Sequence, residues 1–432
     1  MVAAVTVTSS SSSSFSVVGM GKFHGDNQAT FYLMERLKRI ESDPSIRCLE
    51  LANLDLDHPL LYQELQTLWE KLGPFRLERI TWQDCFGGRS FRRSLFNSMP
   101  LVRQLSCCRQ DLTGDEWKVD SVATAVQQDN PNNSLVQTMI LEVCDVAPAA
   151  LETLLSVASH SLDSFHLRRC DLDLDCIHSL ERILPSLHLK CLNLHWCGLG
   201  DDAIAQLGRS LLNHPTLEEW DLAGNICRSG GMNAIRCLLM QSKTLRRLCL
   251  REQCVEDEKL DISSLVAALP YATSLQRLDI SVNKLDDDDM EALPRSLSNN
   301  TTLLELDIRS NHITDRGIHA FFSASSKMSL RKVWLQDNPS ITHVGALAIR
   351  DALHYNVQLE YVGLSQEYPC SHEIDYFTSL NWGGRRLLQD THANVALWPA
   401  VLERACKQDG MDRAANILYH LLQGGPAVLH RR

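Results

Sequence analysis

Residues 303–311 read LLELDIRSN, and residues 275–283 read LQRLDISVN. Both have the pattern L-x-x-L-x-L-x-x-N, and residues 245–253, LRRLCLREQ, depart from it only at the ninth position. The pattern continues in nine further copies, which begin at Ile46, Leu77, Val102, Val136, Leu162, Leu189, Leu217, Leu330 and Leu359. From Ile46 to Leu359 is 313 residues over eleven intervals, a mean period of 28.5 residues. Twelve copies at one period predict a repeat architecture.

Each position of the repeat has a physical role. Because side chains alternate along a strand, positions 4 and 6 are expected to face the core, and positions 3, 5 and 7 to face solvent. An asparagine at position 9 can bond backbone groups that the turn leaves unpaired, and cysteine is a small buried substitute for it. Four copies have cysteine there: Cys85, Cys144, Cys170 and Cys197. We expect these four to pack in the core rather than to bind metal or catalyse.

The segments between the strands change to a helical period. Ile204, Leu207 and Leu211 fall on one face of a helix, and residues 314–322 repeat this pattern after Asn311. Thr314 is expected to cap the N-terminus of that second helix, where the acidic side chain after it is also favoured. Strand and helix therefore alternate, which predicts an α/β fold.

This pattern resembles the leucine-rich repeat, and the resemblance covers residues 46–367. The period and the Asn or Cys at position 9 are similar to the ribonuclease-inhibitor-like subclass. The resemblance implies a solenoid, or horseshoe, with parallel strands on its concave face and helices on its convex face. The spacing is regular from Leu162 onward and irregular in the first four copies.

The two ends of a repeat stack need caps, because each would expose a hydrophobic face. Residues 1–22 are Ser-rich and are expected to form a disordered tail. Residues 23–45 predict a capping helix with Asp26 at its N-cap. Residues 368–432 are expected to form a helical C-terminal cap, with a turn at residues 382–386 and helices at 395–405 and 411–422. This cap resembles the helical tail of short leucine-rich repeat proteins of unicellular algae and related protists.

The composition excludes several classes of function. With 42 basic and 53 acidic residues the net charge is −11, which argues against a general nucleic-acid binder. No apolar run is long enough to cross a membrane. The 15 cysteines are odd in number and form no compact framework, which favours a reducing, cytoplasmic compartment, with the nucleus as an alternative. We expect a monomer that binds neither nucleic acid nor membranes.

Sequence motifs for catalysis are missing. The chain has no G-x-x-x-x-G-K-[ST], G-x-S-x-G or H-E-x-x-H motif. The run Asp286–Asp289 suggests calcium, but it lacks the alternating ligands and the glycine of an EF-hand loop, so a capped helix start is favoured. His166 and His195 have no paired ligand spacing that would support a metal site with Cys191 and Cys249. The sequence therefore predicts no catalytic residues, no metal and no cofactor.

The outward strand positions are the remaining candidate surface. Trp334 is the most informative residue on it, because exposed Trp, Tyr and Arg dominate the energetics of protein interfaces. The alternative is that the charged rows only form cross-strand ion pairs that keep the face soluble. The predicted partner-binding residues are Asp221, Arg251, Arg277, Asp279, Asp307, Arg309, Lys332, Trp334 and Tyr361.

Two functions follow from these observations. The first is a non-enzymatic scaffold that holds a protein partner of unknown identity on the concave face. The second is a regulator of an enzyme in trans, which would resemble ribonuclease inhibitor or the repeat-built activator of the Ran GTPase. The negative net charge suits a basic partner such as a ribonuclease.

Overall fold

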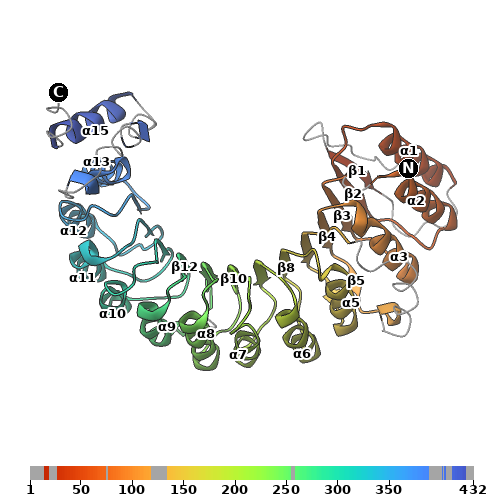
Figure 1. The fold of residues 1–432 in the computed structure, drawn as a ribbon, viewed down its shortest axis with the longest axis horizontal. Coiled ribbons are helices and arrows are strands. Elements are labelled where there is room, and N and C mark those ends of the chain that lie inside the picture. Colours follow the sequence, from red (N-terminus) through yellow and green to blue (C-terminus); the bar gives the residue numbers. More distant parts are fainter. Residues whose placement is uncertain are drawn as a thin grey trace. The chain divides into compact units, whose positions relative to one another are not determined.

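The computed structural model describes residues 14–18, 27–73, 76–117, 134–253, 258–388, 401, 403–404 and 411–424. The chain divides into two compact units, Met1–Ile226 and Cys227–Arg432. Figure 1 shows the same construction within each unit, where helices cover one face of a parallel sheet and the strands form the other. The α/β solenoid predicted from the repeats is confirmed.

The first unit contains a sheet of parallel strands in the order β1, β2, β3, β4, β6, β8, β9 and β10. Their bounds are β1 Ser14–Val18, β2 Cys48–Ala52, β3 Arg79–Gln83, β4 Gln104–Cys108, β6 Thr138–Glu142, β8 Ser164–Arg168, β9 Cys191–His195 and β10 Glu219–Asp221. Two short strands, β5 Asp111–Leu112 and β7 Asp145–Val146, pair separately. The helices are α1 Asn27–Ser42, α2 Pro59–Lys71, α3 Gly88–Ser98, α5 Pro148–Ala158, α6 Leu174–Ile183 and α7 Asp201–Ser210.

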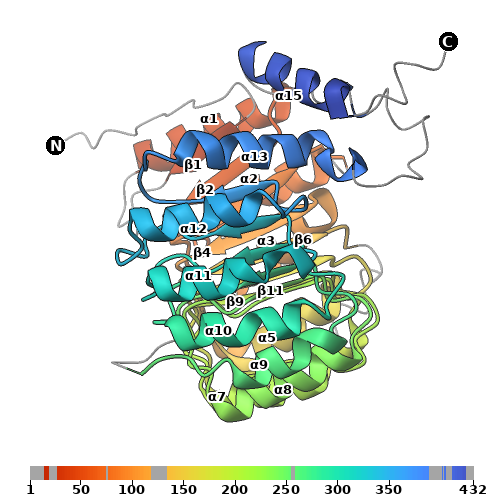
Figure 2. The same ribbon diagram turned by 90° about the vertical axis from the view of Figure 1, so that its left-hand side faces the viewer.

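The second unit repeats this plan with shorter strands. Its parallel strands are β11 Arg247–Cys249, β12 Arg277–Asp279, β13 Glu305–Asp307, β14 Lys332–Trp334 and β15 Tyr361–Gly363. Its helices are α8 Ser229–Gln241, α9 Ser263–Ala268, α10 Asp287–Leu297, α11 Asp315–Ser323, α12 His343–Leu353, α13 Ser371–Gly383 and α15 Met411–Gly424. In Figure 2, α10, α11, α12 and α13 stack in chain order along one side of this unit.

The strand register predicted from the sequence is confirmed in all twelve repeats. Apart from the short strands β5 and β7, each strand from β2 to β15 begins at repeat position 3, including the first four repeats, whose spacing is irregular. In-register pairing places Arg277 beside Glu305, Glu305 beside Lys332, and Lys332 beside Tyr361. Positions 4 and 6 are buried as expected, with Leu306 and Ile308 both fully inaccessible.

Position 9 closes the turn after each strand by bonding the backbone. The amide nitrogen of Asn283 donates to the position 6 carbonyl of the preceding repeat, Leu250, over 2.7 Å. The Cys197 thiol donates to the equivalent carbonyl of Leu167 over 3.2 Å. Burial raises the pKa of Cys197 to about 12, so its sulfur keeps the proton that it donates. This supports the predicted packing role of these cysteines.

Position 8 has left-handed backbone geometry in most repeats. Ten of these residues are not glycine, and they include the β-branched Val143 at a φ of 54° and Val282 at 59°. Only Gly224, at a φ of 71°, is the residue that this conformation favours. The position 8 amide of Val143 donates to the Arg168 carbonyl of the next repeat over 2.8 Å, so the bond between repeats holds this strained geometry in place.

The acidic run at the start of α10 caps helices. Asp286 is the N-cap and accepts bonds from the backbone nitrogens of Asp288 and Asp289 at 3.1 and 3.4 Å. Asp287 accepts from the Thr314 hydroxyl over 2.6 Å, and Thr314 is itself the N-cap of α11. The capping role that the sequence predicts for these residues is confirmed.

The ends of the chain depart from the sequence expectations. Residues 14–18 were expected to belong to a disordered tail, but they form β1, which pairs in parallel with β2. Val17 is fully buried there, because residues 14–18 alternate in a strand pattern that the preceding serines obscure. Helix α1 occurs inside the predicted capping segment, whereas Asp26 lies outside the described residues.

The C-terminal segment contains a helix that the sequence analysis did not predict. Helix α13 reaches Gly383, so Trp382 is helical rather than part of the expected turn, and the helix ends at Gly384 with a φ of 109°. Ile417 and Leu421 of α15 pack with Leu380 of α13. Most of the predicted helix at 395–405 lies outside the described residues. No helix in the described part of the chain is long and apolar enough to cross a membrane.

Candidate functional site

The second unit presents a row of repeat positions that strand alternation places opposite the core. We call this surface the strand face and define it as repeat positions 3, 5 and 7 in the five repeats that contain β11 to β15. Each three-residue strand covers positions 3 to 5, and position 7 follows it in the chain. The strand face consists of Arg247, Cys249, Arg251, Arg277, Asp279, Ser281, Glu305, Asp307, Arg309, Lys332, Trp334, Gln336, Tyr361, Gly363 and Ser365.

An aromatic pair lies towards the end of the strand face. The rings of Trp334 and Tyr361 are 5.8 Å apart between centroids and tilted by 51°. The guanidinium carbon of Arg277 lies 5.4 Å from the centre of the Trp334 ring. Trp334 stays partly exposed, and Tyr361 keeps 40% of its surface accessible. The Trp334 ring therefore packs against its neighbours and still reaches solvent.

Glu305 links two of the predicted cations. It pairs with Lys332 at 2.8 Å on one side and with Arg277 at 3.8 Å on the other. The two cations remain 44% exposed, whereas the Glu305 side chain is 25% exposed. The carboxylate therefore positions the cations while they remain the charges that solvent meets.

Asp307 differs from its expected place. It was predicted to face solvent, but it is fully buried beneath Arg309. The Arg309 guanidinium donates to both carboxylate oxygens, with Nε at 2.9 Å from Oδ1 and a terminal nitrogen at 2.6 Å from Oδ2. This hydrogen-bonded carboxylate raises the pKa of Arg309. The physical reason is the two-residue spacing, which lets the longer side chain fold back over the shorter one.

The aspartates at position 5 also bond their own strand ends. Asp279 Oδ1 accepts from the Ser281 backbone nitrogen at 3.0 Å and from its hydroxyl at 2.6 Å. Asp221 Oδ1 accepts from the Ala223 nitrogen at 2.9 Å in the same way. Asp221 belongs to β10 of the first unit, so it is not part of the strand face of the second. These carboxylates therefore accept hydrogen bonds from backbone nitrogens at the ends of their own strands.

Replacing Asp279 with asparagine tests this structural role. Burial is the main cause that raises the pKa of Asp279, so the folded state disfavours its charged form. Ionised Asp279 therefore lowers the free energy of unfolding at pH values above its pKa in the folded state. This loss of stability disappears as the pH falls towards the pKa that Asp279 has in the unfolded chain. We expect Asp279→Asn, which keeps the oxygen acceptor, to raise the urea midpoint at pH 7. The difference from wild type should vanish near pH 3.5.

A natural asparagine at the same repeat position shows that an amide oxygen can replace the carboxylate as acceptor. Asn193 accepts from the His195 backbone nitrogen at 3.1 Å, as Asp279 does from Ser281. Asp279→Ala loses the acceptor as well as the charge, so it should lower the midpoint at both pH values. An Asp279→Asn variant that is less stable than wild type at pH 7 would contradict the prediction.

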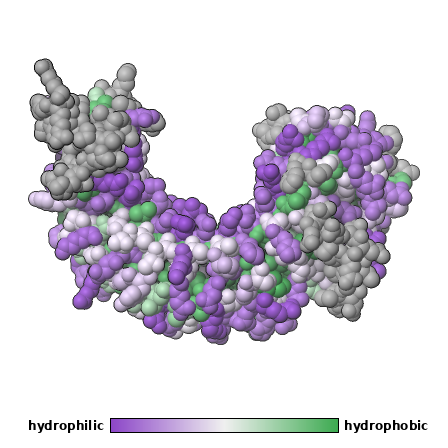
Figure 3. Space-filling model, viewed as in Figure 1, coloured by the Kyte–Doolittle hydropathy of each residue, from purple (hydrophilic) through white to green (hydrophobic). Residues whose placement is uncertain are grey.

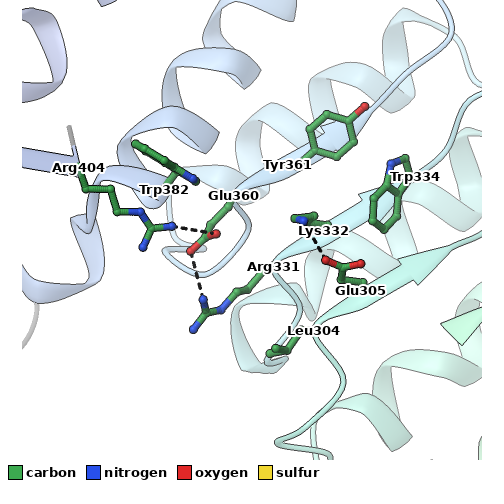
Figure 4. Close-up of a pocket in the computed structure, with 9 residues that line it drawn as sticks. All are labelled: Leu304, Glu305, Arg331, Lys332, Trp334, Glu360, Tyr361, Trp382 and Arg404. Carbon is green, nitrogen blue, oxygen red and sulfur yellow. Dashed lines mark hydrogen bonds and ion pairs between the residues drawn. The ribbon is translucent and has the colours of Figure 1, made fainter. Parts of the chain in front are cut away.

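A pocket of about 610 Å³ opens at the N-terminal ends of β13, β14 and β15. In Figure 4, Trp334 and Tyr361 lie at one side of it, and Trp382 and Arg404 lie at the other. Glu360 is placed between two arginines, 3.7 Å from Arg331 and 3.5 Å from Arg404. Its lining residues are Leu304, Glu305, Arg331, Lys332, Trp334, Glu360, Tyr361, Trp382 and Arg404.

Sequence reasoning identified only part of this pocket. It named Trp334, Lys332 and Tyr361, but it did not consider repeat position 2, where Arg331 and Glu360 lie in neighbouring repeats. The in-register bond from the Glu360 nitrogen to the Arg331 carbonyl, 2.7 Å long, brings that row together. Reading position 2 as a column beside positions 3, 5 and 7 would have found the charged pair.

The second part that was missed comes from the C-terminal segment. Trp382 lies on α13, and the Arg404 guanidinium carbon lies 4.5 Å from the centre of its ring. A cation over an indole face is attracted by the ring's electron density. No sequence pattern links these two residues, because residue 404 reaches Trp382 only through the tertiary packing of the C-terminal segment.

Comparison with known proteins identifies the repeat. A family model described as Leucine Rich repeat matches residues 186–207, 271–293 and 299–322. Mouse ribonuclease inhibitor is 26% identical over 269 residues, which cover 53% of this chain and 58% of that protein. The chain is a ribonuclease-inhibitor-like leucine-rich repeat protein. The subclass predicted from the period and from position 9 is thereby confirmed.

Other relatives of this leucine-rich repeat protein are larger. Mouse NACHT, LRR and PYD domains-containing protein 14 is 29% identical over 192 residues, 43% of this chain. The human protein of that name is 26% identical over 342 residues, 76% of this chain. The chain spans only 19% and 30% of these two relatives. A solved structure of the leiomodin-1 actin-binding site 2 aligns weakly, with 24% identity, a TM-score of 0.28, and coverage of 29% of this chain and 75% of that one.

Among the described residues, no group of three or more His, Cys, Asp or Glu side chains is arranged to hold a metal ion. His166 is mostly covered, and desolvation, followed by the charge of Arg168, lowers its pKa.

Proposed function

We propose that this leucine-rich repeat protein is a non-enzymatic scaffold that binds a protein partner through the strand face of its second unit. The repeat architecture and the relatives support a role in protein interaction. The single observation that carries the finer proposal is the partly exposed cluster of Trp334, Tyr361 and Arg277. These residue types supply most of the binding energy at protein interfaces.

The cluster is preorganised for binding. Its aromatic and cationic side chains already contact one another, and in-register strands fix their spacing. A rigid surface loses little conformational entropy when a partner docks. Of the residues predicted from sequence, the proposal keeps Arg251, Arg277, Lys332, Trp334 and Tyr361. Asp279, Asp307 and Arg309 stabilise the face from within.

Alanine at Trp334 tests the scaffold proposal. The experiment compares the protein partners retained from native lysate by wild type and by Trp334→Ala, with a measured dissociation constant for each partner identified. Removing a central interface tryptophan typically costs about 2–4 kcal/mol of binding. We therefore expect at least a tenfold weaker partner complex, with unchanged circular dichroism.

A second partly exposed tryptophan provides the matched control. Trp196 of the first unit keeps 46% of its surface accessible, so Trp196→Ala makes the same chemical change away from the strand face. That variant should retain the partner. A partner that both variants bind as wild type does would contradict the placement of the site. Arg309→Glu is unsuitable for this test, because it would set a second carboxylate against the buried Asp307.

The similarity to ribonuclease inhibitor favours a second candidate, a regulator that acts on an enzyme in trans. A direct assay separates the two. Purified protein is added to a pancreatic-type ribonuclease, and RNA cleavage is followed with and without a molar excess of the protein. The scaffold proposal expects unchanged cleavage, whereas stoichiometric inhibition would establish the regulator.

A further inference from the structure

The charge of the strand face is opposite to that of the chain. The net charge of the whole sequence is −11. On the strand face, however, five cations stand against three carboxylates, Asp279, Glu305 and Asp307. Asp307 is fully buried. The cations are Arg247, Arg251, Arg277, Arg309 and Lys332.

The same asymmetry occurs in the pocket at the end of this face. Its cations are the more exposed charges, with side-chain accessibility of 35% for Arg331, 44% for Lys332 and 40% for Arg404. Its carboxylates are the more covered, at 10% for Glu360 and 25% for Glu305. A group that enters the pocket therefore meets positive charge first.

The pocket cations keep unused hydrogen-bonding capacity. Both ion pairs of Glu360, at 3.7 Å to Arg331 and 3.5 Å to Arg404, are at or beyond the limit of a good hydrogen bond. Two guanidinium groups offer about ten N–H donors between them, far more than one carboxylate can accept. A second carboxylate between these arginines would bind in a geometry that arginine recognises well.

The walls of the pocket are aromatic. Trp334 and Tyr361 form one side and Trp382 the other, and these side chains come from β14, β15 and α13. The volume of about 610 Å³ falls within the range of roughly 300–1,000 Å³ typical of binding sites. In the view of Figure 3, hydrophobic residues of the second unit form small separate patches among hydrophilic ones.

We infer that the pocket receives an acidic segment of the partner protein, with one carboxylate seated among Arg331, Lys332 and Arg404 and a neighbouring aromatic side chain against Trp334 and Trp382. This inference rests on the proposed scaffold function and specifies the chemistry of its partner. It runs against the basic partner that the net charge of the chain suggests. Charges at the site, rather than the net charge, set the local potential that a docking segment meets.

A nucleic acid fits this surface less well than an acidic protein segment. A polyphosphate needs an uninterrupted run of cations along its backbone. Here Glu305 and Glu360 separate the cations of the pocket from one another. A single carboxylate needs only one such cluster, and the aromatic walls add contact area for the side chain beside it.

The test uses the full chain and three fluorescein-labelled peptides followed by fluorescence anisotropy. In the first peptide glutamate alternates with phenylalanine, in the second lysine replaces glutamate, and in the third alanine replaces phenylalanine. We expect the first to bind at least about tenfold more tightly than either other peptide, a difference of about 1.4 kcal/mol. Its affinity should fall as salt is raised, because charge contributes to it.

Three variants place the peptide in the pocket. Lys332→Gln and Arg404→Gln should each weaken the Glu/Phe peptide about tenfold, with unchanged circular dichroism and urea midpoint. Lys327→Gln makes the same kind of change on the exposed turn after α11, and it should bind as wild type does. Equal binding of the Lys/Phe peptide, or unchanged binding by both pocket variants, would overturn the inference.

Competition with single-stranded polyuridylate separates the two kinds of polyanion. If polyuridylate displaces the labelled Glu/Phe peptide at a lower concentration than the unlabelled Glu/Phe peptide does, the inference is overturned in favour of a nucleic acid. The result with Trp334→Ala keeps the two proposals apart. If that variant loses a captured protein partner while wild type binds no acidic peptide, the scaffold function stands and the acidic-segment inference alone fails.

Discussion

Replacing Asn311 with alanine should lower the free energy of unfolding of the second unit by about 3–5 kcal/mol. Asn311 is almost completely buried. Its Oδ1 accepts from the backbone nitrogens of Asn283 and Leu285 at 2.9 and 3.0 Å, and its Nδ2 donates to the Ile308 carbonyl at 2.9 Å. Alanine would leave these buried backbone groups without partners. Urea unfolding followed by circular dichroism measures the loss.

A graded series makes the cause of this loss visible. Asn311→Cys should be intermediate, because the chain itself uses cysteine at this repeat position, where the Cys197 thiol donates to the Leu167 carbonyl and sulfur is a weaker acceptor than an amide oxygen. Asn299→Ala is the matched control, since Asn299 is exposed just after α10 and its side chain donates to the Arg295 carbonyl at 3.1 Å. It should cost less than about 1 kcal/mol. Equal losses at positions 299 and 311 would show that burial is not the reason.

Replacing Arg309 with alanine should lower the stability of the second unit by about 2–4 kcal/mol. The reason is Asp307, whose buried carboxylate would lose the guanidinium that neutralises it and donates to both of its oxygens. Removing one partner of a buried ion pair costs about 3–5 kcal/mol. We place the loss somewhat lower because Arg309 keeps 37% of its side chain exposed, so water can reach the carboxylate after truncation.

The control for Arg309 is a surface arginine–carboxylate pair with similar donor–acceptor distances. Arg350 donates to Asp351 at 2.9 and 2.6 Å, but Asp351 is 62% exposed. Arg350→Ala should cost less than about 1 kcal/mol, as surface pairs do. Hydrogen exchange over residues 275–340 should rise in Arg309→Ala and stay near wild type in Arg350→Ala. A loss as large in Arg350→Ala would contradict the role given to burial.

These two residues also constrain how the binding surface can be tested. Asn311 and Arg309 support the backbone and the charge balance beneath the strand face, so changing them alters stability before it alters recognition. Trp334, Lys332 and Arg404 project into the pocket (Figure 4). After truncation of Lys332 or Arg404, Glu305 and Glu360 each keep a second cation, Arg277 and Arg331. Binding variants belong at these positions.

The repeat and its register follow from the amino-acid sequence alone. The spacing of leucines predicted all twelve strands, with Leu306 and Ile308 facing the core, because a side chain must alternate along a strand and each repeat must bury the same face. It also predicted the capping of α10 and α11, since an N-cap side chain bonds backbone groups only a few residues away. Such interactions are local, or repeat at a fixed period, so the sequence pattern contains them.

Which outward side chains are available to a partner depends on the folded structure. Asp307 and Asp279 occupy outward positions, yet the first is buried by its neighbour Arg309 and the second bonds the end of its own strand. The pocket needed Trp382 from α13 and Arg404 from the C-terminal segment, which meet β14 and β15 only after the chain folds back. Exposure and pocket shape depend on contacts between residues far apart in the chain, and no repeat pattern specifies those contacts.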